Sequence, residues 1–323
     1  MSKILCIGHI TSDTFLKVED VDIYCDLNTE ECKVSFGFGS KVPVKEVFYS
    51  IGGGAANAAV GLSKLGHEVF AASILGKDSK GSEILADLAG NKVDISYIEQ
   101  DNNSTDQASI ISYGFERTIF TYSYPRKYSI QNIKRKFSAI YLSSVGSEVG
   151  QLYKEIIQLK EKRYVDNLFY NPGSREIKKA RNDMLAILKH VDHLIVNVEE
   201  GCSILNPGLK RADIEIEDLM NLLNEKGPKH IILTDADNGS YLWSDGDFQH
   251  FPAIKTEVVE KTGAGDAYAS GYIAAILYGY DIKEASKFGT INAASAIKSF
   301  GAQSGLLNKE DLIKELGEIP IIT

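Results

Sequence analysis

The chain has 323 residues, 44% of them hydrophobic, and its 44 acidic residues outnumber its 35 basic residues to give a formal charge of −9. This length and composition predict a globular protein with a substantial core. The acidic balance, without a long basic block, argues against nucleic acid or an anionic membrane surface as a partner. No apolar run approaches the ~20 residues that a membrane-spanning helix needs.

Four cysteines are present: Cys6, Cys25, Cys32 and Cys202. They are too sparse for a disulfide framework, and the N-terminus has neither the basic region nor the long apolar region of a secretory signal. We therefore expect a cytoplasmic protein with reduced cysteines. Cys25 and Cys32 have no second Cys or His pair nearby to complete a zinc site, so we expect ordinary side chains there.

The N-terminal segment predicts a buried strand followed by a ligand-binding loop. The run 3–8 is short, apolar and stopped by Gly8, as in strands of parallel sheets. Asp13 follows the expected carboxyl end of this strand, where open α/β sheets bind ligands. A carboxylate there can accept hydrogen bonds from two sugar hydroxyls, and a turn residue is the alternative.

Residues 14–50 and 107–124 differ from the rest of the chain, because they contain strand-like runs and no helix-period segment. We expect them to form a small β-sheet outside the main sheet, standing off the core as a lid. Arg117 follows a turn in the second segment. It either reaches an acidic or phosphorylated substrate or is a solvated hairpin residue.

A glycine-rich loop lies between the two lid segments. Gly52, Gly53 and Gly54 allow close backbone approach to a ligand, and Asn57 offers both a donor and an acceptor to a hydroxyl. No Gly-Lys-Ser/Thr follows, so this is not a nucleotide P-loop, and the third glycine of a dinucleotide fingerprint is missing. The loop leads into a helix that we expect to end near Leu65.

Strand and helix patterns alternate beyond this loop. Apolar strands are expected at 69–75, 139–143, 168–170, 194–198 and 231–233, and helices near 82–89, 148–162, 176–189 and 217–225. Three more helices are expected at 267–278, 282–299 and 309–316. This alternation predicts an α/β fold, with a mostly parallel sheet covered by helices on both faces. We expect a single domain spanning residues 1–323.

The stretch Thr262-Gly263-Ala264-Gly265-Asp266 stands at the start of an expected helix. The glycines allow a sharp turn whose N–H groups point at one spot, and a helix N-terminus favours an anion there. Asp266 cannot bind phosphate itself, but it can accept a proton from a hydroxyl that attacks one. The alternative is an ordinary tight turn with an aspartate in the first helical turn.

Two other strand ends carry polar residues, Asn197 with Glu200 and the loop from Thr234 to Gly239. Magnesium prefers oxygen ligands and usually keeps several waters, so Glu200 acting through water is sufficient to organise a metal–triphosphate complex. The alternative for Glu199 and Glu200 is a solvated helix start.

The two glycine segments resemble the N-terminal and C-terminal signatures of the ribokinase-like carbohydrate kinases, the PfkB family. The resemblance extends over almost the whole chain, through Gly8 with Asp13, Asn197 with Glu200, the loop 234–239, and Gly301-Ala302-Gln303. It implies a ribokinase-like three-layer sandwich with a β-sheet lid. It also implies ATP-dependent transfer of the γ-phosphoryl group to a hydroxymethyl group of a sugar or a sugar-containing molecule.

By this resemblance, Asp266 is the general base, and the amides of Gly263, Ala264 and Gly265 form the anion hole. The acceptor would be held by Asp13, Gly53, Gly54 and Asn57. Glu200 would organise magnesium. The nucleotide would lie along Asn197, Thr234, Gly239, Gly265 and Asn292.

Two positions depart from the family pattern. Members often carry Asp-Thr-Thr before the glycine turn, and the aspartate helps bind a monovalent cation; here the residues are Glu260-Lys261-Thr262. Our hypothesis is that the Lys261 ammonium supplies charge there, so that potassium dependence is weaker than usual. Ala236 replaces a glycine that is frequent in the nucleotide loop.

The acceptor is open at this stage. The sequence favours a sugar kinase acting on ribose, fructose or a ketodeoxygluconate-like acid, and a nucleoside kinase is the alternative because Tyr122 and Tyr124 can stack on a ring. These tyrosines can equally pack in a homodimer formed through the lid. A catalytically silent sugar- or nucleotide-binding protein is a third hypothesis. A Rossmann-type oxidoreductase is disfavoured, since the loop after the first strand lacks a glycine-rich turn.

Overall fold

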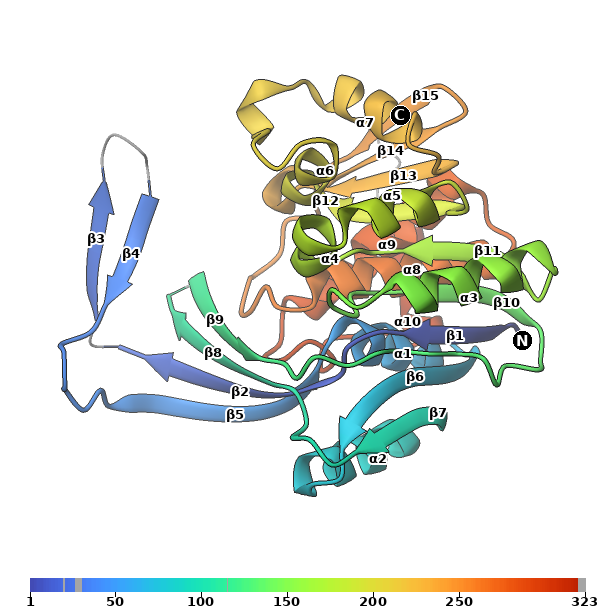
Figure 1. Ribbon diagram of the computed structural model, residues 1–323. Coiled ribbons are helices and arrows are strands. Elements are labelled where there is room, and N and C mark those ends of the chain that lie inside the picture. The colour runs from blue at the N-terminus through green and yellow to red at the C-terminus, as the bar shows by residue number, and fades with distance from the viewer. Residues whose placement is uncertain (20, 27–30, 115, 319–323) are drawn as a thin grey trace.

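The computed structural model describes residues 1–19, 21–26, 31–114 and 116–318. A nine-stranded sheet lies at its centre (Figure 1), and its strands are β1 Lys3–Ile7, β6 Glu68–Gly76, β7 Val93–Asp101, β10 Phe137–Leu142, β11 Val165–Tyr170, β12 His193–Asn197, β13 His230–Thr234, β14 Ser240–Ser244 and β15 Asp247–Phe251. Their order across the sheet is β15-β14-β13-β12-β11-β10-β1-β6-β7. All neighbours pair in parallel except β13 with β14 and β14 with β15.

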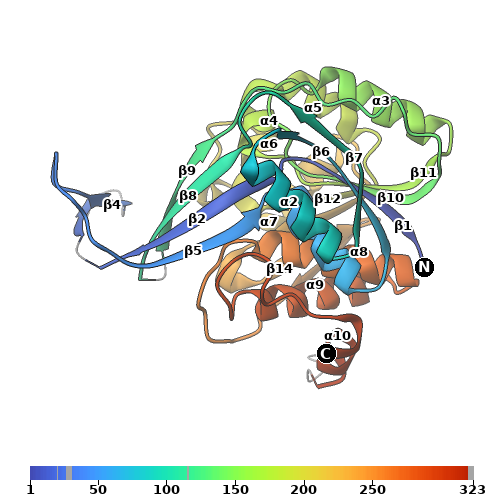
Figure 2. The same ribbon diagram turned by 90° about the horizontal axis from the view of Figure 1, so that it is seen from below.

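Helices cover both faces of this sheet (Figure 2) because its central strands are apolar on both sides. One core lies beneath α1 Gly54–Lys64, α2 Ser79–Gly90, α8 Ala264–Tyr278, α9 Ile282–Ala296 and α10 Lys309–Glu318. The other lies beneath α3 Gly150–Glu161, α4 Ser174–Lys179, α5 Arg181–Leu188, α6 Val198–Leu205 and α7 Ile216–Asn224. The three-layer α/β fold expected from the sequence is confirmed.

Differences from the expected elements are local. The helix expected at 176–189 is two helices, since Ala180 leaves the helical conformation with φ −120° and ψ 31°. Strands β7, β14 and β15 and helix α6 were not predicted, because they are short or carry many polar residues. Within the described ranges, no helix combines the length and apolar character needed to cross a membrane.

The two β-rich segments form a separate sheet beside the core. Its strands are β2 Thr11–Val18, β5 Val44–Gly52, β8 Gln107–Tyr113 and β9 Glu116–Tyr122, in the order β5-β2-β8-β9. A small apolar cluster of Phe15, Ala108 and Ile110, with Phe48 against it, holds the strands together. In Figure 1 this lid sheet extends away from the α/β core.

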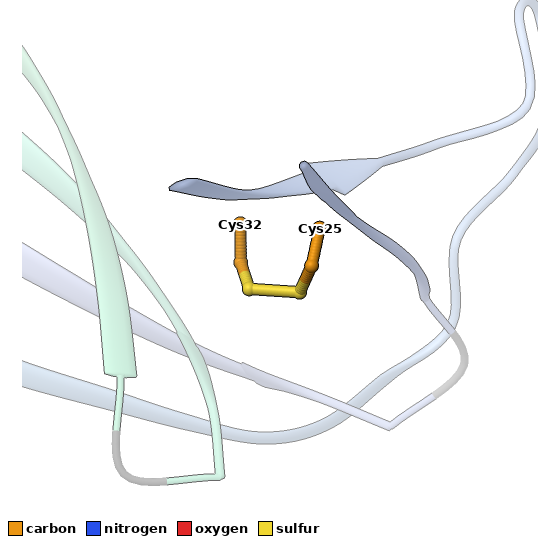
Figure 3. Close-up of a disulfide and its surroundings, with 2 residues drawn as sticks. All are labelled: Cys25 and Cys32. Carbon is orange, nitrogen blue, oxygen red and sulfur yellow. A yellow bond between two sulfur atoms is a disulfide. The ribbon is translucent and has the colours of Figure 1, made fainter. Parts of the chain in front are cut away.

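A hairpin of β3 Asp22–Asp26 and β4 Glu31–Ser35 stands at the far end of the lid (Figure 1). Cys25 and Cys32 lie directly opposite each other in its ladder and form a disulfide (Figure 3). The expectation that both would be ordinary reduced side chains is therefore wrong. Seven positions separate them in the sequence, and only the antiparallel pairing of the hairpin brings their sulfur atoms together. Cys6 and Cys202 are free and buried.

The connections around β1 create the place for a site. From β1 the chain enters the lid, returns to form β6 on one side of β1, and later forms β10 on the other side. The carboxyl ends of β1 and its neighbours therefore meet at a switch in strand order, where open α/β sheets leave room for ligands.

Candidate active site

The glycine turn before α8 has the geometry that an anion hole needs. Gly263 caps the helix with φ 82° and ψ 0°, a left-handed conformation that favours glycine. A β-carbon on Gly263 would lie 2.4 Å from Cβ of Ala302, so the close contact also requires glycine. A β-carbon on Gly265, in contrast, would meet no atom within 4 Å. The space beside Gly265 is thus open at a helix N-terminus.

Asp266 lies in the first turn of α8, and α1 and β10 hold its carboxylate. The side-chain amide of Asn57 donates to Oδ2 of Asp266 at 2.8 Å, and the hydroxyl of Tyr141 lies 3.5 Å from Oδ1. Gln303 in turn donates to Oδ1 of Asn57 at 3.1 Å, which fixes the orientation of the Asn57 amide. The carboxylate is therefore held in one direction by a chain of hydrogen bonds.

Burial raises the pKa of Asp266, and the hydrogen bonds from Asn57 and Tyr141 partly oppose this effect. A carboxylate with a raised pKa is a stronger base than an exposed one. The structure places this carboxylate at the end of α8 that carries the glycine turn. The arrangement can remove a proton from a hydroxyl while the turn faces an anionic group.

The residues expected to hold an acceptor gather around Asp266. The side chain of Asp13 is buried and accepts a hydrogen bond from Thr11 at 2.6 Å. A β-carbon on Gly54 would lie 3.2 Å from Oδ1 of Asp266, and one on Gly53 would lie 2.3 Å from the carbonyl oxygen of His9. The glycine loop therefore brings its backbone against both the loop after β1 and the Asp266 carboxylate.

Burial raises the pKa of Asp13 to about 6; the hydrogen bond from Thr11 opposes this rise, and the charge of Asp266 adds a smaller one. A carboxylate whose pKa is raised by burial and by a second carboxylate is unfavourable in its charged form unless a ligand donates hydrogen bonds to it. A molecule with several hydroxyl groups supplies such donors.

A cavity of about 410 Å³ lies next to the glycine turn. Four of the residues expected along the nucleotide line it: Asn197, Thr234, Gly239 and Gly265. Lys261 and Arg117 line it too, so the cavity has cationic groups close to the turn. Ala236, also in its wall, adopts φ 44°, which explains why glycine suits that position.

Asn292 does not lie in this cavity, and the expectation that it contacts the nucleotide needs correction. Its side chain is fully buried between α8 and α9. Nδ2 donates to the carbonyl oxygen of Ala267 at 2.8 Å and to Oγ of Ser270 at 3.2 Å, while Oδ1 accepts from the amide of Leu307 at 3.1 Å. All its hydrogen-bonding groups are occupied inside the protein. Thr290, Ala293, Ala294 and Ile297 are the residues of this region that reach the cavity.

Glu200 and Asn197 form a reciprocal pair of hydrogen bonds at the N-terminus of α6. Asn197 accepts from the Glu200 amide at 2.7 Å, and Oε2 of Glu200 accepts from the Asn197 amide at 3.0 Å. Burial, with smaller contributions from Asp266, Glu199 and Glu176, raises the pKa of Glu200 to about 7, although the Asn197 amide lowers it. This concentration of negative charge suits a cation.

Among the described residues, no three His, Cys, Asp or Glu side chains converge to hold a metal ion. A divalent ion bound largely by phosphates and waters, with Glu200 as a single acidic contact, fits this set of donors.

Sequence reasoning did not predict the contacts of three residues of the site, of which Glu260 was named only as a departure from the family pattern. Tyr141 was hidden inside an apolar strand, and Gln303 was noted only as part of a motif near the end of the chain. Glu260 is the third: its Oε1 accepts from the amide and the hydroxyl of Thr262 at 2.9 and 2.7 Å. None carries a local signal of its role, because each acts on a residue elsewhere in the fold or braces the turn.

Comparison with known proteins agrees with this geometry. The profile of the family described as "pfkB family carbohydrate kinase" matches residues 1–309. The chain belongs to the PfkB family. A PfkB enzyme is a phosphotransferase with an alcohol group as acceptor, so the recognition made from the two glycine segments is confirmed.

Relatives of this PfkB kinase differ in their acceptors. It is 26% identical to a nucleoside kinase of Methanocaldococcus jannaschii over 98% of this chain and 97% of the relative. It is 25% identical to a ribokinase of Lactococcus lactis, with 99% of each chain covered. The crystal structure of Arabidopsis thaliana ribokinase complexed with ribose and ATP superposes with a TM-score of 0.77 at 19% identity, covering 98% of both chains, and shows the shared fold.

Proposed function

We propose that this PfkB kinase transfers the γ-phosphoryl group of ATP to a hydroxymethyl group of a carbohydrate such as ribose, fructose or a ketodeoxygluconate-like acid. One observation carries the proposal: the Asp266 carboxylate is fixed by Asn57 at 2.8 Å beside a glycine turn that borders an open cavity. This arrangement supports the proposal that a base, an anion site and room for a nucleotide lie side by side.

In the proposed reaction, the acceptor hydroxyl loses its proton to Asp266 as its oxygen bonds to the γ-phosphorus and the bond to the β-phosphate oxygen breaks. The amides of Gly263, Ala264 and Gly265 would hold the negative charge on the transferring group. One such donor typically contributes about 3–4 kcal/mol of transition-state stabilisation. Because phosphoryl transfer depends mainly on positioning and charge neutralisation, these groups form a sufficient minimum.

Asp13, Gly53, Gly54 and Asn57 would position the acceptor, and the raised pKa of Asp13 supports this role because bound hydroxyls would relieve its repulsion with Asp266. Asn197, Thr234, Gly239 and Gly265 would contact the nucleotide. Glu200 would hold magnesium through water, and the ion would neutralise phosphate charge when bound. The lid would then exclude water from the acceptor.

We also propose a weak potassium dependence, with Lys261 supplying the charge that a monovalent cation supplies elsewhere in the family. Lys261 lines the cavity together with Gly265, which supports this role. The measurement is turnover against potassium concentration, in wild type and in Lys261→Thr. We expect a nearly flat curve for the wild type and a steeper one for the variant. A steep wild-type curve that the variant retains contradicts the proposal.

A nucleoside is the second candidate acceptor. The nucleoside kinase of Methanocaldococcus jannaschii aligns with nearly the whole chain, which supports this alternative. A cytoplasmic location is also proposed, supported by the need for ATP. Thiol trapping in fresh cell extract tests this location: Cys25 and Cys32 found as free thiols would support a cytoplasmic protein.

The first experiment compares wild type with Asp266→Asn and with the surface control Asp218→Asn, following ADP release with ATP and magnesium. The acceptors are ribose, fructose, ketodeoxygluconate, fructose phosphates, adenosine, inosine and guanosine. We expect one class to respond, with turnover at least about a hundredfold lower in Asp266→Asn and unchanged in the control. A response to nucleosides alone selects the second candidate. ATP binding without any turnover favours a silent binding protein.

A further inference from the structure

The lid touches the glycine turn through a buried glutamate. Glu260 precedes the turn, and its side chain is only 5% exposed. Its Oε1 accepts from the amide and hydroxyl of Thr262, and its Oε2 lies 3.4 Å from the hydroxyl of Ser112 on lid strand β8. One carboxylate therefore contacts both the turn and the lid.

Arg117, on the neighbouring lid strand β9, supplies the charge opposite Glu260. Its Nε lies 3.8 Å from Oε1 of Glu260 and is buried without a hydrogen-bond partner among the described residues. A buried, unpaired guanidinium nitrogen is unfavourable unless a nearby anion compensates its charge. The guanidinium also lines the 410 Å³ cavity, so this contact lies at the edge of the nucleotide site.

The other side of the turn is braced by the lid as well. Ala302 packs against Gly263, and Phe300, two residues earlier, stacks on Phe48 of lid strand β5 with ring centroids 4.6 Å apart. The ammonium of Lys17 on β2 lies 5.5 Å from the centroid of the same ring. The lid thus contacts both segments that flank the turn, at Glu260 and at Phe300.

A second cavity, of about 190 Å³, lies behind this contact and is lined by Glu260, Ser112, Lys17 and Phe300, with Val258 shared between the two cavities. Glu260 therefore borders this second cavity, while its partner Arg117 borders the first. A side chain in this position can change its partners when the lid moves, because few atoms have to be displaced.

We propose that Glu260 is a positioning residue that couples the lid to the anion hole. When Ser112 and Arg117 engage its carboxylate, Glu260 holds Thr262 and thereby fixes the amides of the glycine turn. When the lid moves away, this restraint is lost. The anion hole is then fully ordered only over a covered acceptor, which limits hydrolysis of ATP by water. The catalytic consequence rests on the proposed kinase function, whereas the mechanical coupling does not.

The test combines Glu260→Gln, Arg117→Met and the double variant in a mutant cycle. Glutamine keeps an oxygen that can accept from Thr262 but removes the charge that faces Arg117. The readout is hydrogen exchange of the amides of Thr262, Ala264 and Ala267 without nucleotide. Lys45→Met is the matched control, because Lys45 pairs with Glu19 and takes no part in the contacts of Glu260 and Arg117 described above.

We expect exchange at these amides to rise about tenfold in each single variant and no further in the double variant. The control should match wild type. Unchanged exchange in Arg117→Met overturns the proposal, and so does a double variant whose effect is the product of the two single effects.

Kinetics separate this coupling from the function. With ATP and the acceptor that turns over fastest, Arg117→Met and Glu260→Gln should each lower kcat about tenfold, and the ATP hydrolysed per acceptor phosphorylated should rise. If exchange behaves as expected but no acceptor is phosphorylated, the coupling stands and the proposed function fails. If turnover is robust but exchange does not respond, the function stands and the coupling fails.

Discussion

At the scale of single residues, the site is a set of carboxylates that the fold withdraws from water, Asp13 fully and Asp266 and Glu200 in part. Burial raises the pKa of Asp266, Asp13 and Glu200, and the charge of Asp266 contributes to the shifts of the other two. Such shifts cost stability at neutral pH, where the unfolded chain would ionise these groups freely. A cluster of this kind is characteristic of a site arranged for chemistry at the expense of stability.

Because ionised Glu200 lowers the stability of the folded protein, we predict that Glu200→Gln stabilises the protein at high pH. The folded pKa of Glu200, about 7, is above its ordinary value of 4.5, so its contribution to stability is present below pH 4.5 and is lost as the pH rises through 7. Glutamine does not ionise and keeps an oxygen for the Asn197 amide. We expect the free energy of unfolding to rise by about 1–3 kcal/mol at pH 8 and to change little at pH 4.

The measurement is urea denaturation of the nucleotide-free protein at both pH values. Glu199→Gln is the control, because Glu199 is exposed on the same helix turn. Equal effects of the two substitutions at pH 8, or a loss of stability in Glu200→Gln, would contradict the assignment of this cost to the buried carboxylate.

At the scale of elements, α8 and α9 form the platform on which the glycine turn rests. Asn292 joins these helices to the segment at Leu307 through the hydrogen bonds of its side chain. A buried amide whose donors and acceptor are all used stabilises one arrangement of the elements around it. Its role is therefore in packing, behind the nucleotide cavity.

This role predicts a particular outcome for Asn292→Ala. The substitution leaves the Leu307 amide without its partner, so we expect the free energy of unfolding to fall by about 1–3 kcal/mol. The KM for ATP should stay within about twofold of wild type, because a residue acting through packing makes no contact that the nucleotide would lose. The KM for ATP and the stability of Asn292→Ala are compared with those of Thr290→Ala, because Thr290 lies in the cavity wall. A large rise in the KM for ATP of Asn292→Ala, with unchanged stability, would contradict the packing role and support the nucleotide contact expected from the sequence.

At the scale of the whole molecule, the lid is a sheet with one exposed apolar surface. Its outer strands expose Phe120 and Tyr122 on β9 and Val47 and Tyr49 on β5, and the strand register places these four side chains on the same face. Exposed apolar side chains concentrated on one small sheet are typical of a surface that another protein covers. The homodimer suggested by the lid tyrosines in the sequence is consistent with this distribution and stays a prediction.

We expect wild type to sediment as a dimer at micromolar concentration and Phe120→Lys to shift toward monomer, because burying an ammonium in an apolar interface is unfavourable. Phe38→Lys is the control, since Phe38 is exposed but lies outside the strands of the lid sheet. A wild type that sediments as a monomer at every concentration would refute the lid-mediated dimer.

Much of the site was readable from the sequence because its signals are local. The turn from Thr262 to Asp266 and the loop from Gly52 to Asn57 each combine glycines with one polar side chain at a loop-to-helix transition. The alternation of apolar strands and amphipathic helices likewise predicts a parallel sheet wherever it occurs. These features depend on neighbours a few residues apart, so the sequence by itself predicts the fold class and also the anion site and base that we propose.

Only the tertiary structure decided which distant residues act together. Asn57 and Asp266 are 209 positions apart, and no spacing rule predicts that one fixes the other. The same reason explains Tyr141 and Gln303 in the site, Asn292 outside it, the pairing of Cys25 with Cys32, and the contact of Arg117 with Glu260. Sequence periodicity specifies which side chains are buried, whereas the directions in which buried polar groups find partners depend on how the elements pack.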